Sequence, residues 1–300
     1  MMNFEEFKAW VKENITSKDW KETSQVEISV VKKNNGVSKA GLFIRESGQD
    51  VSPILYLDDY YIHYQNGELL ENVIKKIRDD YNEKVQMAAV KIPNLQEFEN
   101  VRGKIIYRLV NYEKNKELLE DCPHRRLHDL AVTFRWVAHI DDDGVSTSLI
   151  TNRQVKEWGI TVNDLVLAAQ QNTPRLFPAK IIDMEEMLAG KVSFILYPSA
   201  IPMYILTNEQ EINGASALLY GDVLKDFADK KGTDMYILPS SIHEVILLPS
   251  DRINDPTKLL SMVHDANTTV VSIGDVLSDS VYYYDRKTDH ITEIVSDEKM

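Results

Sequence analysis

Two hydroxyls, an imidazole and a carboxylate occur together in the segment Pro-Ser-Ser-Ile-His-Glu, residues 239–244, which separates two apolar runs. Nucleophilic catalysis by a hydroxyl needs a base within hydrogen-bond reach and a third group that orients this base. The segment supplies each type: Ser240 or Ser241 as nucleophile, His243 as base and Glu244 as the orienting carboxylate. In this interpretation the protein is a hydrolase-like enzyme.

A structural interpretation competes with the catalytic one. Ser-x-x-Glu has the spacing of a capping box, in which a hydroxyl and a carboxylate satisfy the first backbone N–H groups of a helical turn. No Gly-x-Ser-x-Gly elbow surrounds the serines. We therefore favour a turn in which Ser240 or Ser241 caps a single helical turn between two strands, with catalysis as the alternative.

A second polar group lies in Cys-Pro-His-Arg-Arg-Leu-His-Asp-Leu, residues 122–130. Its metal-competent residues are Cys122, His124, His128 and Asp129. They lack a further ligand at a standard spacing, although a thiol beside a histidine can be nucleophilic. We expect no metal here and predict a polar loop that leads into a buried strand, with Asp129 capping or paired with Arg125. His124, Arg125 and Asp129 remain candidates for ligand binding.

Arg175 is the last candidate ligand-binding residue. It stands between Pro174 and Pro178, and this stiff presentation of a guanidinium suits a carboxylate or a phosphate. Alternatively, Arg175 closes a helix terminus or pairs with a surface acid. The acidic run Asp141-Asp142-Asp143-Gly144 predicts a hairpin turn, because it lacks the alternating ligands of a calcium loop.

Composition and charge exclude several classes of protein. The chain of 300 residues has a formal net charge of −13, which argues against general nucleic-acid binding, because phosphate contacts need clustered Lys and Arg. Cys122 is the one cysteine, so an intrachain disulfide is excluded. No Gly-rich phosphate loop, dinucleotide fingerprint or paired Cys motif occurs, and we expect no cofactor. With no signal peptide and no apolar run of membrane-spanning length, we expect a cytoplasmic protein without a membrane partner.

The pattern of elements predicts an α+β fold with mainly antiparallel sheets, hairpins and flanking helices, in two or three packed units. Apolar residues at helical spacing predict a helix over 4–15. Asn35-Gly36 predicts a hairpin, since both turn residues must take positive φ. Thr151 and Thr161 are predicted to begin helices through capping boxes, and Pro174 is predicted to stop the second helix.

The boundary between units is expected within residues 87–103. Pro93 precedes Asn94, which we interpret as the N-cap of a short helix that Gly103 closes. The N-terminal unit then comprises residues 1–92, and the C-terminal region comprises 93–300, with a subdivision near 190 left open. A strand is predicted over Val-Ser-Phe-Ile-Leu-Tyr, residues 192–197.

Several stretches together resemble a known bacterial family. They are KNNGV, GLFIRE, SPILYL, PHRRLHDLAVTFRW, NTPRLFP, YILPSSIHEVILLP and VLSDSVYYYDR. The family is catalogued only as a domain of unknown function and occurs widely in anaerobic gut Firmicutes. The resemblance covers nearly the whole chain and implies a shared fold and a cytoplasmic bacterial origin. It implies no activity, cofactor or catalytic residue.

Three functions follow as expectations. The leading one is a non-enzymatic binding or regulatory protein that meets a protein or small-molecule partner through a cleft between units. The alternative is the hydrolase-like enzyme built on Ser240 or Ser241 with His243. The third is a nucleic-acid-associated protein of a mobile element, which would need a basic patch to overcome the overall charge.

Overall fold

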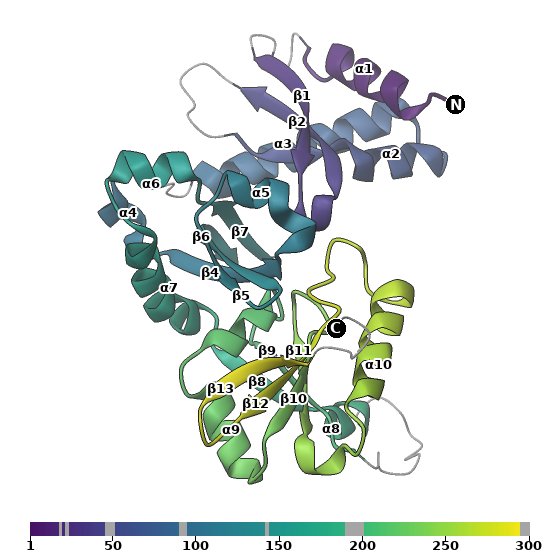
Figure 1. Ribbon diagram of the computed structural model, residues 1–300. Coiled ribbons are helices and arrows are strands. Elements are labelled where there is room, and N and C mark those ends of the chain that lie inside the picture. Colours follow the sequence, from purple (N-terminus) through teal and green to yellow (C-terminus); the bar gives the residue numbers. More distant parts are fainter. Residues whose placement is uncertain are drawn as a thin grey trace. The chain divides into compact units, whose positions relative to one another are not determined.

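A computed structural model describes residues 1–17, 20–21, 24–45, 52–89, 95–141, 144–189 and 201–294. The chain forms two compact units, Met1–Pro93 and Asn94–Met300 (Figure 1). Every strand pair in the described residues is antiparallel, and helices flank the sheets. The predicted α+β class is confirmed.

The first unit contains a three-stranded sheet in the order β1-β2-β3. Its described elements are α1 (Phe4–Asn14), β1 (Gln25–Lys32), the 3-10 helix η1 (Asn34–Gly36), β2 (Ser38–Arg45), β3 (Ile54–Tyr56), α2 (Leu57–Gln65) and α3 (Leu70–Ala89). The predicted first helix is confirmed, and it packs Phe7 and Val11 into the core of this unit. Asn35 and Gly36 take φ of 57° and 72°, as the predicted hairpin requires.

The second unit begins with a four-stranded sheet in which β4 and β5 flank β6, and β7 pairs with β6 along another part of its length. Its described elements are α4 (Phe98–Arg102), β4 (Ile105–Asn111), η2 (Glu113–Asn115), α5 (Lys116–Glu120), β5 (His124–Leu127), β6 (Leu130–Asp141), β7 (Gly144–Leu149), α6 (Asn152–Trp158) and α7 (Val162–Leu176).

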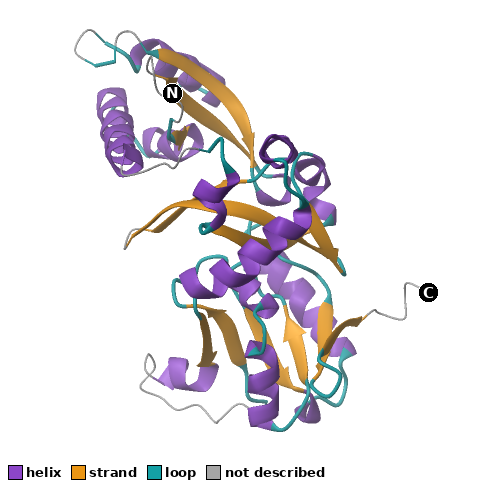
Figure 2. Ribbon diagram, turned by 90° about the vertical axis from the view of Figure 1, so that its left-hand side faces the viewer, coloured by secondary structure: helices purple, strands orange, loops and turns teal. Residues whose placement is uncertain are grey.

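The rest of the second unit is a six-stranded sheet in the order β13-β12-β10-β11-β9-β8, which Figure 2 shows as a separate layer. Its described elements are β8 (Ala179–Asp183), α8 (Met184–Ala189), β9 (Tyr204–Asn208), η3 (Gly214–Leu219), α9 (Val223–Lys231), β10 (Met235–Leu238), β11 (Val245–Pro249), η4 (Ser250–Arg252), α10 (Thr257–Thr269), β12 (Val281–Asp285) and β13 (His290–Ile294). Helix α10 buries Leu259 and Val263 against Leu238, Leu248 and Val281 of the sheet.

Side chains from two helices join the two sheets of this unit at β4. The N–H groups of Tyr107 and Leu109 point away from β6 and donate to the hydroxyls of Thr173 in α7 and Ser216 in η3, each at 3.2 Å. These bonds satisfy backbone donors that an edge strand otherwise leaves unpaired. They also bring η3 directly beside β4.

Both predicted capping boxes are confirmed: the side chains of Thr151 and Thr161 accept from the backbone of Gln154 and Asp164. Pro174 does not stop α7, which continues to Leu176. A proline without an N–H costs least near a helix end, and here only its last turn follows.

Other predictions fall in part outside the described residues. Gly103 follows the end of α4 as predicted, but the helix begins after Glu97, and Asn94 lies outside the described residues. The strand predicted over 192–197 and the turn residues Asp142 and Asp143 also lie outside them. The hairpin around that turn is present, because Asp141 pairs with Gly144.

Candidate functional site

The segment 239–244 joins β10 to β11 and contains no helical turn. The predicted single helical turn is therefore wrong. The Ser241 N–H donates to the Glu244 carbonyl at 3.1 Å, and the Ser241 hydroxyl accepts from the His243 N–H at 3.0 Å. A short side-chain-to-backbone turn thus replaces the capping box, because the strand resumes before a helical turn can form. We refer to residues 239–244 as the 239–244 turn.

The His243 ring has a contact at each nitrogen. Nδ1 accepts from the backbone N–H of Asn213 at 3.2 Å, and Nε2 lies 3.6 Å from a carboxylate oxygen of Asp275. A nitrogen that accepts from an amide carries no proton itself, so the proton of the neutral ring is on Nε2, on the side of Asp275. The ring is 38% exposed.

The described contacts do not bring the candidate catalytic groups together. The Ser240 hydroxyl lies 3.5 Å from a carboxylate oxygen of Glu244, whereas the Ser241 hydroxyl bonds to backbone. Among the described hydrogen bonds, neither hydroxyl contacts the His243 ring. Asp275 faces this imidazole in the place where sequence reasoning put Glu244, and no local spacing could have identified it.

The 239–244 turn packs closely against Gly214 at the start of η3. A Cβ at this position would lie 2.5 Å from the His243 carbonyl oxygen and 2.7 Å from the backbone nitrogen of Asn208. The Ala215 N–H also donates to the Ile242 carbonyl at 3.3 Å. Backbone thus meets backbone here, and only glycine leaves enough room.

The predicted ligand-binding residues in β5 and its turn are occupied by contacts within the protein. Residues 124–127 form a strand rather than a loop, because they pair with β6 in register. His124 Nδ1 bonds to the Cys122 carbonyl at 3.0 Å, and the Arg125 guanidinium donates to the Asn163 side chain. Asp129 accepts from the hydroxyls of Ser278 and Tyr282, so its predicted pairing with Arg125 is wrong.

The surroundings of Cys122 and Arg175 also indicate a structural role for each residue. Burial raises the pKa of the Cys122 thiol to about 11, and Asp121 adds to the effect, which keeps the thiol protonated at neutral pH. Arg175 donates to the Gly103 carbonyl at 2.8 Å, where it closes the C-terminus of α4. Among the described residues, no cluster of three metal-competent side chains occurs.

Arg108 is the polar group that sequence reasoning missed. It lies in the middle of β4, directly opposite Thr133 of β6. The residue is half-buried, and its Nε is fully buried without a hydrogen-bond partner. The structure shows no hydrogen bond or ion pair of this guanidinium with any described residue. The available signal was a single Arg inside the apolar run Ile105–Val110.

A second guanidinium lies on the same face of the sheet. Arg135 is two positions from Thr133 along β6, and it donates through Nε to the Thr147 hydroxyl at 2.7 Å. Burial is the main cause that lowers the pKa of Arg108 to about 9, and the positive charge of Arg135 lowers it further, whereas the Asp275 charge acts in the opposite direction. Arg108 remains cationic at neutral pH.

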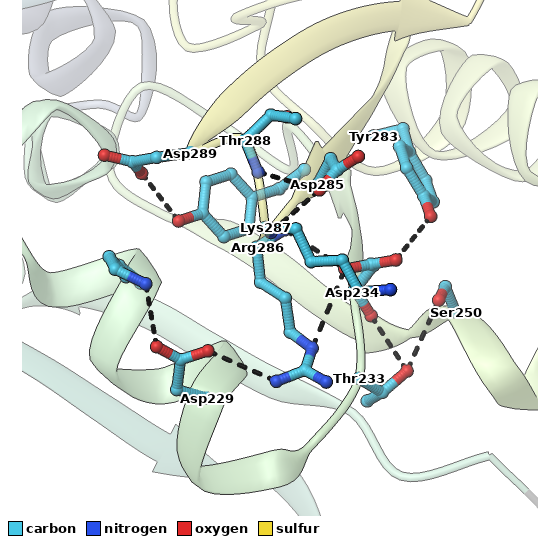
Figure 3. Close-up of polar contacts among 12 residues, drawn as sticks. Asp229, Thr233, Asp234, Ser250, Tyr283, Asp285, Arg286, Lys287, Thr288 and Asp289 are labelled. Atoms are coloured by element: carbon cyan, nitrogen blue, oxygen red, sulfur yellow. Dashed lines mark hydrogen bonds and ion pairs between the residues drawn. The ribbon is translucent and has the colours of Figure 1, made fainter.

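The opposite end of the β10–β11 strand pair carries a different set of polar groups (Figure 3). Asp234 accepts from the Tyr283 hydroxyl at 2.8 Å and from the Arg286 N–H at 3.0 Å. The Arg286 guanidinium lies 3.3 Å from Asp229, which also binds Lys225 at 2.8 Å. We refer to Asp234, Tyr283, Arg286, Asp229 and Lys225 as the Asp234 network.

The protein therefore has an α+β fold. Among the described residues, the groups of the Asp234 network bind one another, whereas the Arg108 guanidinium has no partner. Residues 4–286 match the model of a family of unknown function, DUF5688, and the chain belongs to this family. No curated protein and no solved structure matches the chain. In the part of the chain that the structure describes, no helix has the length and apolar character to cross a membrane.

Proposed function

We propose that this protein is a non-enzymatic, cytoplasmic bacterial binding or regulatory protein, and that it takes an anionic group of a protein or small-molecule partner at Arg108. The observation that carries the proposal is the Arg108 guanidinium, half-buried and without a hydrogen-bond partner among the described residues.

An unpaired guanidinium is costly in this position. Removal of a charge from water costs several kcal/mol after relaxation, by order of magnitude, unless a counter-charge and hydrogen bonds offset it. Arg135 lies on the same face and adds a second positive charge. A carboxylate or phosphate placed against the planar fork of Arg108 would supply both the charge and the acceptors.

One anionic group fits this position better than a polyanion. Arg108 and Arg135 lie within a sheet, and the whole chain carries a formal net charge of −13. Nucleic acid binds through many phosphate contacts spread along a basic surface. A local cationic position in an acidic protein favours a ligand with a single anionic head.

The test follows the Arg108 side chain by NMR in the full-length protein. Acetate and inorganic phosphate are added separately at constant ionic strength, and the Nε–Hε signal of Arg108 is recorded. We expect a saturable shift for Arg108 and a non-saturating change for Arg153, whose exposed guanidinium is already paired with Glu157 at 2.7 Å. The signal to be followed is identified by its loss in Arg108→Met.

A saturable shift of the neighbouring Leu109 and Thr133 amides gives a second readout, and it should disappear in Arg108→Met. If neither anion produces a saturable shift at Arg108, the proposed function is wrong. The same holds if Arg108→Met leaves the shifts of Leu109 and Thr133 unchanged, because the anion then binds elsewhere.

A further inference from the structure

We infer that a cavity in the first unit binds a small α-amino acid as a zwitterion, with its ammonium group at Asp80 and its carboxylate at Lys84. This inference goes beyond the proposed function, because it concerns a second site that residues of the unit Met1–Pro93 form by themselves. Arg108 belongs to the other unit.

The cavity has a volume of about 190 Å³ and lies between β3, α2 and α3. Its lining residues are Leu55 and Tyr56 of β3, Asp59, Tyr60 and His63 of α2, and Lys76, Asp80 and Lys84 of α3. A water molecule takes about 30 Å³ in the liquid, and pockets for drug-sized ligands begin at roughly 300 Å³. The volume therefore suits a molecule of the size of an amino acid.

Two charged or titratable groups on the α2 side of the cavity already have partners. The Asp59 carboxylate binds the Lys39 ammonium group at 2.8 Å. His63 Nδ1 lies 3.3 Å from a carboxylate oxygen of Glu68. Among the described lining residues, α2 therefore offers a ligand no unpaired carboxylate or ammonium group, and the open charges lie on α3.

Asp80 of α3 is held in a fixed position with one oxygen open. The hydroxyl of the buried Tyr60 donates to Oδ2 of Asp80 at 2.7 Å, and Lys76 Nζ lies 4.0 Å from the same oxygen. Burial is the main cause that raises the pKa of the Tyr60 phenol, and Asp80 adds to the effect, so the phenol keeps the proton that it donates. Oδ1 of Asp80 has no bond to a described residue, and it can accept from the ammonium group of a ligand.

Lys84 lies one turn further along α3 and has no partner among the described residues. Side chains four positions apart on a helix have their Cβ atoms about 5–6 Å from each other, and a carboxylate before a lysine is the favourable order for an ion pair. Even so, no ion pair joins Asp80 to Lys84, which are both described residues of this helix. By contrast, Lys225 and Asp229 of α9 bind each other directly at 2.8 Å. The pair on α3 is therefore open to a ligand.

The adjacency of these two charges favours a zwitterion over a simple anion or cation. An anion at Lys84 is repelled by Asp80, and a cation at Asp80 is repelled by Lys84. An α-amino acid carries its ammonium group and its carboxylate on one carbon, and it can satisfy both residues at once. Leu55 and the rings of Tyr56 and Tyr60 complete the lining with apolar surface, which suits an apolar side chain.

The experiment uses three probes that share one side chain: leucine, 4-methylpentanoate, which lacks the ammonium group, and 3-methylbutylamine, which lacks the carboxylate. Each is added to the full-length protein at pH 7 and constant ionic strength, and the amide signals of Leu55 and Asp80 are followed by NMR. We expect a saturable shift with leucine. Either analogue should bind about tenfold more weakly, because it has lost one charge-assisted contact.

Two variants assign the two contacts. In Asp80→Asn, which keeps an acceptor for the Tyr60 hydroxyl, leucine and 4-methylpentanoate should bind with equal affinity. In Lys84→Met, leucine and 3-methylbutylamine should bind with equal affinity. Asp79→Asn and Lys75→Met are the matched controls, since both residues are exposed on α3 and do not line the cavity. Both controls should keep the wild-type order of the three probes.

The outcomes separate this site from the Arg108 site. A saturable leucine shift that persists in Arg108→Met supports the inference, whatever acetate and phosphate do at Arg108. A leucine shift that is lost in Arg108→Met contradicts it, because the carboxylate of leucine then binds there. Absence of a saturable shift at Leu55 and Asp80, or equal affinities of the three probes for the wild type, contradicts it as well. So does an unchanged preference for leucine in either Asp80→Asn or Lys84→Met, since one of the two contacts is then missing.

Discussion

The β10–β11 strand pair ends on one side in the 239–244 turn and on the other in the Asp234 network, and the two ends differ in how their polar groups are bonded. In the network, carboxylates, a phenol and a guanidinium bind one another. At the turn, Ser241 and His243 bond to backbone, and Arg108 near it in the fold has no partner among the described residues. The comparison indicates that the Asp234 network stabilises the fold, whereas Arg108 is available to bind a ligand.

The 239–244 turn should tolerate a larger side chain less well than the Asp234 network does. Gly214→Ala places a methyl group against the His243 carbonyl and the Asn208 nitrogen, and neither backbone group can move without shifting a strand. We expect a loss of about 3 kcal/mol in the free energy of unfolding, typical of severe overpacking. Urea-induced unfolding measures it, with Gly221→Ala as control, since a Cβ there meets no atom within 4 Å. Equal stability of the two variants would contradict the close packing of this turn.

Replacement of arginine by methionine should have opposite effects on the free energy of unfolding at Arg286 and at Arg108. Arg286→Met removes the ion pair with Asp229 and leaves Asp234 with fewer partners, and we expect a small loss in the free energy of unfolding, because exposed ion pairs contribute little. Arg108→Met replaces an unpaired, half-buried charge by an apolar chain of similar length, and we expect no loss and a gain of up to about 1 kcal/mol.

Chemical denaturation of both variants at low salt measures this contrast. A loss for Arg108→Met as large as that for Arg286→Met would show that Arg108 has a structural partner, and the distinction between the two ends would fail.

Although Ser240 and Ser241 are adjacent in the turn, they should contribute differently to the free energy of unfolding. Ser241→Ala removes the acceptor of the His243 N–H, at 3.0 Å, and should cost about 1 kcal/mol of unfolding free energy. Ser240→Ala removes only a 3.5 Å contact with Glu244 and should cost less than about 0.5 kcal/mol. Unfolding curves of the two variants decide the order. Equal losses in the two variants would contradict this difference between the two hydroxyls.

The smallest expected effect is a pH dependence of the unfolding free energy that arises from Tyr283 in the Asp234 network. Loss of hydration, together with the Asp234 carboxylate, raises the pKa of Tyr283 to about 12. The native state therefore binds the phenolic proton more tightly than the unfolded state, whose tyrosines titrate near 10 by order of magnitude. The stabilisation from Tyr283 is complete below about pH 10 and disappears as the pH rises through about 12.

The unfolding free energies of wild type and Tyr283→Phe measure this effect between pH 9 and 12. Their difference should decrease as the pH rises, because the phenylalanine has no proton to lose. Other tyrosines titrate equally in both proteins and cancel. A constant difference over this interval would show that the Tyr283–Asp234 bond contributes nothing to the network.

Local chemistry explains the features that could be predicted from the sequence. The capping boxes at Thr151 and Thr161 need only residues three positions apart, and the hairpin at Asn35-Gly36 needs only two residues that accept positive φ. Apolar periodicity marked α1 for the same reason. In each case the energy that selects the structure comes from neighbours in the chain.

Tertiary contacts decided the features that were predicted wrongly or missed. The 239–244 turn has the residue types and spacing of a capping box. However, the strands on either side and the backbone near Gly214 leave no room for a helical turn. Residues 124–127 read as a polar loop, yet they form a strand because β6 offers free backbone groups. Pairing across the chain overrides local preference when it satisfies more hydrogen bonds.

The sequence by itself determined the α+β class, the caps, the hairpins and the family, because each depends on short-range pattern or on direct resemblance. The tertiary structure alone decided which polar groups find partners. Asp234 meets Tyr283 and Arg286 across 49 and 52 positions of the chain, and Asp275, from the loop after α10, lies 3.6 Å from His243 Nε2. A charge is costly or stabilised according to what surrounds it in space, and only the folded chain brings those surroundings together.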